Sequence, residues 1–462
     1  MRTRLLSAAL AAMLVGCTVG PEYKRPEIAT PAAWKAAPEV TTPSPWPATA
    51  WWNGFQSPVL TAHIEQAQRA NYDIAAAAAR VAQADARAKI AGAALLPAVD
   101  AGADVSRSRL SSSTSSSRSA RVVTAYNTSL AATYELDFWG KNRSALTSAQ
   151  SLAQATRYDR ETIAITTMAN VGTTYFSVLE FRDRLAIARD NLENAERVLA
   201  IVEARVNNGA ASALDLAQQR TVVANQRAAI PALEQQLRQT ENALAILLGE
   251  TPDRLTIANG SLDDVTLPVI APGLPSELLM RRPDVANAEA QLIAANADIN
   301  TARAALFPSI QLTAQAGFAS GALTSLFDGP GFFWTLVASV TQPIFEGGRL
   351  SGQVDLTEAR YEELVQVYRG AVINAFRDTE DALVAIRQLA DQQGLQEEAV
   401  RQARTAFDLA DTRYRGGLDT LLNVLDAQRT LFQARDQLVQ IRSARLQATV
   451  ALFRALGGGW AI

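Results

Sequence analysis

Apolar side chains recur every seven residues in two stretches of the chain, which start 209 positions apart at 216 and 425. The two series are Leu216, Val223, Ile230, Leu237 and Leu244, and Leu425, Phe432, Val439, Leu446 and Phe453. A seven-residue repeat keeps one apolar seam on one side of a helix and predicts supercoiled helix pairs. Pro231 interrupts the first series and is expected to kink or break that helix.

Two further stretches predict unusually long helices. Lys141 to Asn207 contains no proline and only one glycine, and Arg349 to Arg415 also lacks proline. At a rise of 1.5 Å per residue, each stretch would be about 100 Å long if unbroken. A compact domain does not need such a helix, so an elongated coiled-coil scaffold is one interpretation of this pattern.

Between the helical stretches, four segments alternate apolar and polar positions with a period of two. The alternation is nearly complete from Tyr126 to Phe138 and clear in Ile310–Phe318 and Trp334–Thr341, and it is weaker in Val99–Val105. Period-two segments of about ten residues with aromatic side chains near their ends are typical of transmembrane β-strands. A soluble, half-buried sheet is the alternative.

The four strands of one chain cannot close a barrel. An open sheet edge in lipid would leave backbone groups unpaired at a cost of several kcal/mol each, so the edges must pair with other subunits. Two chains would supply eight strands and almost no lumen, whereas three would supply twelve and room for a channel. The links Ser106–Ala120 and Gly321–Gly331 are expected to be exposed loops.

The order of these segments is the same in both halves of the chain, which indicates an internal duplication. Residues 79–97 and 290–308 are identical at eight of nineteen positions. We expect a first repeat at 57–248 and a second at 283–456, each with a helix, a β-hairpin and a long helix pair, joined by an equatorial linker at 249–282. The hairpins are expected at about 97–139 and 308–346, the helix turns at about 207–212 and 415–419, and a tail at 457–462.

The N-terminus has the pattern of a secretory signal. Arg2 and Arg4 precede a short apolar run that ends before Cys17, the only cysteine of the chain. This pattern resembles a bacterial lipobox and predicts a signal peptide at 1–16, a lipid on Cys17 and a tether at 17–56. The residue after Cys17 is Thr18 and not Asp, and in this the sequence resembles lipoproteins of the outer membrane. An ordinary signal with an accidental cysteine is the alternative.

Composition argues against several function classes. The chain has 43 basic and 46 acidic residues and a net charge of −3, so nothing in it favours nucleic acid as a partner. No phosphate-binding glycine loop or dinucleotide motif occurs. His63 is the only histidine; it is expected on a helix surface, and alone it makes no metal site. An enzyme is therefore not expected, nor a cofactor apart from the lipid.

Together these features resemble the TolC/OprM-type outer-membrane efflux factors, in their NodT-like lipoprotein branch. The marks are the segment from Cys17 to Tyr23 followed by Pro26, the block from Trp51 to Phe55, and the two helix turns. The resemblance implies an α+β membrane protein in the outer membrane. Its expected form is a homotrimeric 12-stranded barrel continuous with a long periplasmic α-helical coiled-coil barrel. It also implies a periplasmic adaptor and an inner-membrane RND-type pump as partners.

Within this resemblance the two helix turns form the periplasmic mouth and dock the adaptor. The docking residues would be Arg205, Gly209, Arg413 and Gly417, and the two glycines are expected in tight turns that need positive φ.

The resemblance also implies a periplasmic gate just beyond the turns. Asp215, Asn423 and Asp426 would line a constriction, where threefold repetition makes rings of polar side chains, and Tyr414 would be a latch. Asn423 stands where the family has a carboxylate, and Asp419 where TolC has a gating arginine, so the family's closed-state bonds cannot be carried over. Alternatively, each acid is merely solvated on a helix flank.

Three functions remain open from the sequence. The first is a passive outer-membrane duct that exports drugs or other small amphiphilic molecules from a tripartite pump. The second is the outer-membrane duct of a type I protein secretion system. The third is a coiled-coil lipoprotein scaffold without a pore.

Overall fold

The computed structural model describes residues 19–36, 48–110, 121–268, 270, 273 and 275–460. The predicted signal peptide at 1–16 and the predicted lipidation site Cys17 lie outside these residues. The chain forms two compact units. The first comprises Met1–Glu27, Arg80–Arg157 and Asn287–Arg369, and the second comprises Ile28–Ala79, Tyr158–Ala286 and Gly370–Ile462.

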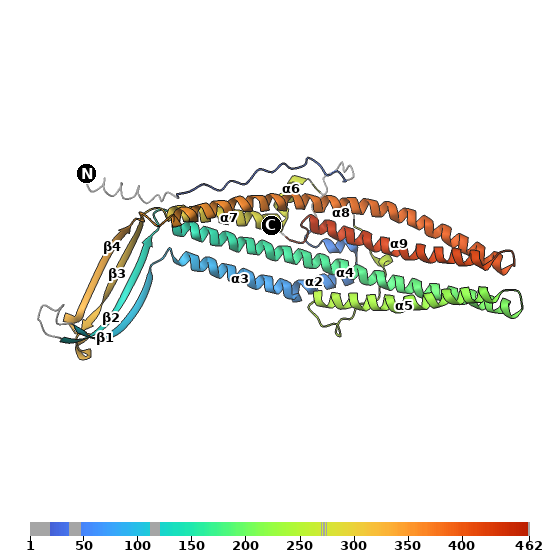
Figure 1. Ribbon diagram of the computed structural model, residues 1–462, viewed down its shortest axis with the longest axis horizontal. Helices are drawn as coiled ribbons and strands as arrows, with labels where there is room; N and C mark the ends of the chain where they lie inside the picture. The colour runs from blue at the N-terminus through green and yellow to red at the C-terminus, as the bar shows by residue number, and fades with distance from the viewer. Residues whose placement is uncertain are drawn as a thin grey trace. The chain divides into compact units, whose positions relative to one another are not determined.

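The first unit contains an antiparallel sheet with the strand order β1-β2-β3-β4 (Figure 1). The strands are β1 (Ala98–Leu110), β2 (Arg121–Leu136), β3 (Ser309–Ser320) and β4 (Phe332–Thr341). The loop expected at Ser106–Ala120 was wrong for residues 106–110, because β1 continues there by pairing with β2. Two short 3₁₀ turns, η3 (Leu323–Ser325) and η4 (Gly329–Gly331), occupy the link between β3 and β4. β1 and β4 are the edges of the sheet: among the described residues, β1 pairs only with β2 and β4 only with β3.

One face of the sheet is apolar because the register aligns the apolar positions of all four strands. Ala101 lies opposite Leu130, Leu130 opposite Ala316, and Ala316 opposite Trp334. Much of this face is exposed in the single chain; Leu130 is 60%, Trp334 70% and Leu336 71% exposed. We call it the apolar sheet face. It comprises Val99, Ala101, Ala103, Val105, Tyr126, Thr128, Leu130, Ala132, Tyr134, Leu136, Ile310, Leu312, Ala314, Ala316, Phe318, Phe332, Trp334, Leu336, Ala338 and Val340.

Four helices connect to the strands. They are α3 (Tyr72–Ala93), α4 (Lys141–Asn207), α7 (Pro283–Ala304) and α8 (Arg349–Arg415), and α4 and α8 each have 67 residues. No described helix is both long and apolar enough to span a bilayer. The first unit also fixes part of the N-terminal segment, because Arg25 donates to both carboxylate oxygens of Glu289 at 2.6 and 2.7 Å and Asn296 donates to the Pro21 carbonyl at 3.0 Å.

The second unit contains the main core. Its further elements are η1 (Trp51–Phe55), α2 (Pro58–Ala70), α5 (Ala213–Leu247), η2 (Leu262–Asp264), α6 (Pro275–Arg281) and α9 (Leu421–Ala455). Trp51 stacks on Phe453 at 4.9 Å and Phe55 packs on Phe176 at 5.1 Å, so η1 is bound to α4 and α9 through aromatic contacts. The second heptad series supplies α9 with Phe432, Val439, Leu446 and Phe453, all buried.

The structure bears on two expectations about single residues; the expected break at Pro231 and the expected surface position of His63 were wrong, whereas a kink at Pro231 stays a prediction. Pro231 does not break α5, which runs through it from Ala213 to Leu247. Pro231 and Arg227 are exposed, so water can reach the Arg227 carbonyl that lacks an N–H donor, while Val223 and Leu244 remain buried on either side. His63 is not on the surface: it is buried in α2 beside the Tyr175 ring at 5.8 Å, and burial lowers the pKa of its imidazole.

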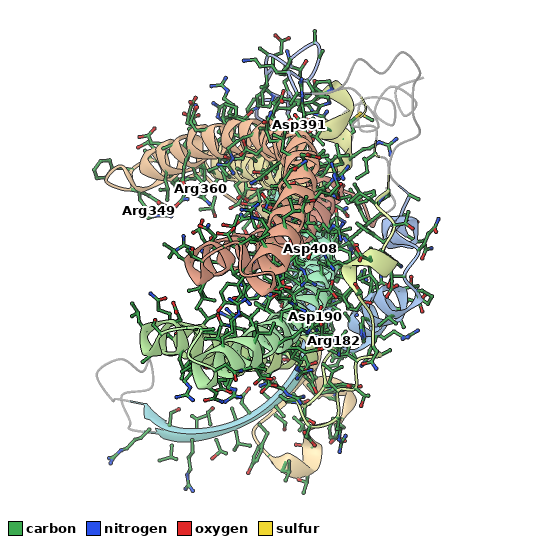
Figure 2. All side chains as sticks on the ribbon, turned by 90° about the vertical axis from the view of Figure 1, so that its right-hand side faces the viewer. Arg182, Asp190, Arg349, Arg360, Asp391 and Asp408 are labelled. Atoms are coloured by element: carbon green, nitrogen blue, oxygen red, sulfur yellow. The ribbon has the colours of Figure 1, made fainter. Side chains whose placement is uncertain are left out.

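Polar side chains of α4 hold a loop segment and a second helix of the second unit. Arg182 of α4 donates to the carbonyls of Ala258 and Ile257 at 2.6 and 3.2 Å, which holds that segment on the helix (Figure 2). Asp190 of α4, which is labelled in Figure 2, pairs with Arg435 of α9 at 3.0 Å.

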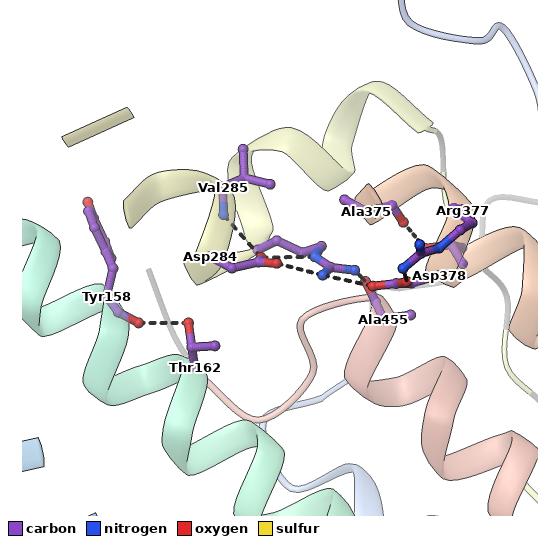
Figure 3. A network of polar contacts seen from close by, with 10 residues as sticks. Tyr158, Thr162, Asp284, Val285, Ala375, Arg377, Asp378 and Ala455 are labelled. Carbon is purple, nitrogen blue, oxygen red and sulfur yellow. Dashed lines mark hydrogen bonds and ion pairs between the residues drawn. The ribbon is translucent and has the colours of Figure 1, made fainter. Parts of the chain in front are cut away.

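A second network surrounds Arg282, between α6 and α7. Arg282 binds Asp284 at 2.6 Å, Asp378 at 3.2 Å and the Ala455 carbonyl at 3.2 Å (Figure 3). Burial opposes the charge of Arg282, but the bonds and charges of Asp284 and Asp378 outweigh it and raise the pKa.

Candidate functional site at the helix turns

The turn between α4 and α5 is closed by two backbone hydrogen bonds. Gly209 donates to the Val206 carbonyl at 2.9 Å, and Ala210 donates to the Arg205 carbonyl at 2.8 Å. Gly209 has φ 71°, a conformation that a glycine adopts without the steric cost of a Cβ atom. This pair of bonds is the Schellman motif, which satisfies carbonyls left free at the end of a helix.

The turn between α8 and α9 repeats this geometry. Gly417 has φ 75° and donates to the Tyr414 carbonyl at 3.0 Å, and Leu418 donates to the Arg413 carbonyl at 2.9 Å. Arg205 and Arg413 therefore occupy the same position of the same motif.

The side chains that start the next helices differ. In the first turn Ser212 and Asp215 form a capping box: the Asp215 N–H donates to Ser212 Oγ at 3.1 Å, and the Ser212 N–H donates to Asp215 Oδ2 at 2.9 Å. The carboxylate of Asp215 thus stabilises the first turn of α5 by binding a free backbone N–H. Its predicted gate role stays a prediction.

In the second turn, Asp419 is the carboxylate that binds a backbone N–H at the start of the next helix. Its carboxylate accepts hydrogen bonds from the Asn423 amide at 2.5 Å, the Thr420 N–H at 2.9 Å and Arg413 Nε at 3.2 Å. These donors, with Asn423 first, lower the pKa of Asp419. Asn423 is therefore held by a residue of its own turn.

Arg205 connects the two turns. Its guanidinium lies over the ring of Tyr414, 4.3 Å from the ring centroid, and donates to the Arg415 carbonyl at 3.2 Å. A guanidinium over an aromatic face is attracted by the ring's quadrupole. Arg205, predicted as an adaptor-docking residue, thus also joins the end of α4 to the end of α8.

Tyr414 lies in a small apolar cluster behind the turns. The tip cluster consists of Val198, Val202, Ala410, Tyr414, Leu421 and Val424, from α4, α8 and α9. Tyr414 is 4% exposed, and its hydroxyl has no hydrogen-bond partner among the described residues. A latch that reaches another subunit needs an accessible side chain, so this burial favours a packing role; the latch stays a prediction.

Asp426 is an exposed residue of the predicted gate whose carboxylate, among the described residues, is bound only within its own helix. It pairs with Arg429 one turn further along α9, at 2.5 Å, and its side chain is 65% exposed. Both residues line a groove of about 510 Å³ between α5 and α9. Other residues of the groove are Gln218, Thr221, Asn225, Leu422 and Phe432. Among the described residues, no bond joins Asp426 to Asp215.

Sequence reasoning missed two glutamines that occupy equivalent places in the two repeats. Gln219 is buried in α5 and donates to the Ala195 carbonyl of α4 at 2.8 Å. Gln428 is equally buried in α9, but neither amide atom has a partner among the residues described. Aligning the two heptad series would have placed them together, because each stands next to an arginine, Arg220 or Arg429.

The sequence model of the family described as "Outer membrane efflux protein" matches residues 63–250 and 274–458. The chain belongs to this family. The two matched stretches overlap the two predicted repeats, and the predicted family resemblance is confirmed.

Individual relatives cover the chain almost completely. The pyoverdine export outer membrane protein OpmQ of Pseudomonas putida is 44% identical over 98% of this chain and 96% of its own length. The cation efflux system protein CusC of Escherichia coli O6:H1 is 32% identical over 99% of both. The solved structure of the outer-membrane channel OprN has a TM-score of 0.90 at 27% identity and covers 96% of this chain and 100% of that one.

These similarities establish the class of the protein. It is an efflux channel of the outer membrane, and the described part of its chain has the fold of such channels, with a four-stranded sheet and long helices. The predicted fold class, function class and location are thereby confirmed.

Proposed function

We propose that three copies of the chain form a passive outer-membrane duct that exports small molecules delivered by a periplasmic adaptor and an inner-membrane RND-type pump. The observation that carries this proposal is the incomplete sheet. β1 and β4 have free edges beside an exposed apolar face, and a sheet in lipid is stable only when its edges are paired. Four strands from each of three chains close a twelve-stranded barrel with a lumen.

The test of the duct is reconstitution in planar bilayers. Purified full-length protein is expected to migrate as a trimer in detergent and to conduct ions. A dispersed monomer without conductance would overturn the proposal and favour the scaffold without a pore.

The gate proposal assigns the constriction chiefly to Asp426. Asp215 and Asn423 are engaged by their own turns, whereas Asp426 is exposed and paired only with Arg429 on its own helix. Three copies of Asp426 would form a ring of carboxylates that attracts cations. Tyr414 would support the closed arrangement through its packing.

Asp426→Ala is expected to raise single-channel conductance or the antibiotic leak of cells that carry the channel. Asp408→Ala is a matched control, because Asp408 of α8 is also exposed, at 62%, and faces an arginine on the adjacent helical turn (Figure 2). Equal conductance of Asp426→Ala and the wild type would contradict the gate.

The docking proposal places the adaptor at the two turns, where Arg413 is 58% and Leu418 73% exposed. Gly209 and Gly417 keep the turns narrow. Photo-crosslinkers at Leu418 are expected to capture the adaptor, and crosslinkers at Leu395 of α8, 75% exposed, serve as the control. Capture at Leu395 alone would contradict docking by the turns.

For cargo we propose a siderophore of the pyoverdine type. The support is similarity: the relative named for pyoverdine export is 44% identical, against 32% for the relative named for cation efflux. Expression in a Pseudomonas putida strain that lacks OpmQ should restore pyoverdine fluorescence in the medium. No restoration by a channel that still conducts in bilayers would contradict the cargo but not the duct.

A lipid on Cys17 is the last part of the proposal. The expected diacyl and amide-linked chains would anchor the N-terminus, since more than one chain is needed for stable attachment. Cys17→Ser should abolish labelling with radioactive palmitate, and persistent labelling would contradict the assignment.

A further inference from the structure

Two arginines of β1 lie on the same side of the sheet as the apolar sheet face, past its last apolar residue on that strand. Side chains alternate between the two faces along a strand, and Arg107 and Arg109 lie two and four residues after Val105 on β1. They therefore point to the same side of the sheet as Val105. Both are exposed. Arg107 lies opposite Thr124 and Arg109 opposite Val122, so neither faces a carboxylate across the strand pair.

Strand length sets the height of the two arginines relative to the apolar band. On β2 the band runs from Leu136 to Tyr126, ten steps or about 33 Å along the strand. With the strands of such barrels tilted by about 40°, this length rises about 25 Å, which matches the apolar band of outer-membrane barrels. Arg107 and Arg109 then lie about 5 and 10 Å above the band, at the level of lipid headgroups.

The paired strands β1 and β2 extend beyond the end of β3, up to this level. β3 ends at Ser320, opposite Tyr126, whereas β2 continues to pair with β1 as far as Arg121. The extra part carries the two arginines, and it lies at the end of the sheet away from α3 and α4, the helices that adjoin the other ends of these strands along the chain. In the proposed duct the helices lie in the periplasm, so the loop ends of the strands lie at the outer leaflet.

At the opposite end of the sheet, basic side chains form ion pairs within the chain. Lys141 pairs with Glu135 at 2.7 Å and Arg143 with Asp137 at 3.2 Å. Arg107 and Arg109, by contrast, have no ion pair or hydrogen bond with any other described residue. Their charges are left for a ligand.

We propose that Arg107 and Arg109 bind the phosphate groups of the anionic glycolipid that fills the outer leaflet of the outer membrane. Guanidinium groups bind phosphate through paired, charge-assisted hydrogen bonds. Residues two apart on a strand lie about 7 Å apart, so both side chains can reach one headgroup. Pairing of β1 with a second copy leaves this site open, because side chains stand off the sheet face and not along its edge. The site rests on the proposed duct.

The experiment compares two lipid probes on purified trimers: bisphosphorylated lipid A, and the same lipid with its phosphates removed. Each basic residue at an anionic lipid surface strengthens binding about fivefold, so Arg107→Gln/Arg109→Gln should weaken binding of the phosphorylated probe about 30-fold. Binding of the dephosphorylated probe should not change. Arg107→Lys/Arg109→Lys should keep much of the affinity, because the charge remains.

Arg80→Gln/Arg87→Gln of α3 is the matched control, since it removes the same charge from two exposed arginines away from the strands. It should bind both probes as the wild type does. Equal binding of the phosphorylated probe by wild type and Arg107→Gln/Arg109→Gln would overturn the site.

Conductance separates this inference from the function on which it rests. All variants should form channels in bilayers made without phosphorylated glycolipid. A wild type that conducts but does not prefer the phosphorylated probe overturns the lipid site alone. A wild type that fails to conduct overturns the duct.

Discussion

The two helix turns share one backbone and differ in their side chains. Gly209 and Gly417 close the same motif with nearly the same φ, 71° and 75°. Beyond them, a compact capping box starts α5, whereas Asp419 gathers three donors at the start of α9. The duplicated backbone needs only a glycine at one place, so the side chains around it were free to diverge.

The difference continues into the helix pairs. Gln219 binds the facing helix, while its counterpart Gln428 is buried without a partner, and a buried amide without hydrogen bonds is destabilising by about 1–3 kcal/mol. At this position the second pair therefore lacks the hydrogen bond that the first pair has. Arg205 crosses from the first turn to the second and joins α4 to α8.

The largest effect is expected from Tyr414→Ala. It empties the centre of the tip cluster and removes the surface on which Arg205 lies, so the free energy of opening of the turns should fall by about 4 kcal/mol. Amide hydrogen exchange of residues 410–424 measures this. Tyr414→Phe is the control: it removes only the unpartnered hydroxyl and should be neutral or slightly stabilising. An equal fall in the free energy of opening in both variants would show that the hydroxyl of Tyr414, and not its ring, stabilises the turns.

The two glutamines provide a matched pair of substitutions. Gln428→Leu should stabilise the α8–α9 pair by about 2 kcal/mol, because it removes a buried polar group that has no partner. Gln219→Leu breaks an existing bond and should be neutral or destabilising by about 1 kcal/mol. Thermal denaturation of the two variants measures the contrast. Destabilisation by Gln428→Leu would show that this amide has a partner in the assembled protein.

Substitution of the two arginines of the turns should lower the stability of the turns by different amounts. Arg205→Ala loses the contact with the Tyr414 ring and the bond to Arg415, about 1.5 kcal/mol together. Arg413→Ala loses only a solvent-screened pair with Asp419 and should cost less. Hydrogen exchange at the turns distinguishes them. A larger loss for Arg413→Ala would mean that the link across the turns contributes little.

The smallest effect concerns pH. The pKa of Asp419 is lowered in the folded protein, so its carboxylate stabilises the start of α9 above the ordinary carboxyl pKa of about 4, and this contribution is lost as the pH falls below that value. The wild type should therefore be more stable than Asp419→Asn at pH 6, and the gap should narrow toward pH 3. Protection of the 420–424 amides, corrected for intrinsic exchange, reports the gap. A gap independent of pH would exclude the charge as its cause.

Most of the architecture could be predicted because it depends on periodicity. The 67-residue helices follow from the absence of proline, and the hairpins from alternation that continues for ten residues. The expected break at Pro231 does not occur, and local sequence could not show that the freed carbonyl faces water. His63 was misjudged because its neighbour Tyr175 is more than a hundred residues away in the chain.

The candidate site was less accessible to sequence reasoning. The positive φ of Gly209 and Gly417 followed from their place after a long helix. The burial of Tyr414, the contact with Arg205 and the bonds of Asp419 depend on side-chain directions at helix ends, which no period encodes. The roles of Asp215, Asn423 and Asp426 in a gate remain predictions that conductance measurements can test.

The surroundings of Arg282 have a consequence for biogenesis. The guanidinium is 11% exposed, and one of its acceptors, the Ala455 carbonyl, belongs to the end of the last long helix. A chain that enters the periplasm N-terminus first cannot complete this site until almost its entire length has been translocated. Early termination upstream of residue 455 would leave a charged group short of an acceptor in the interior, and such fragments should be prone to degradation by periplasmic proteases.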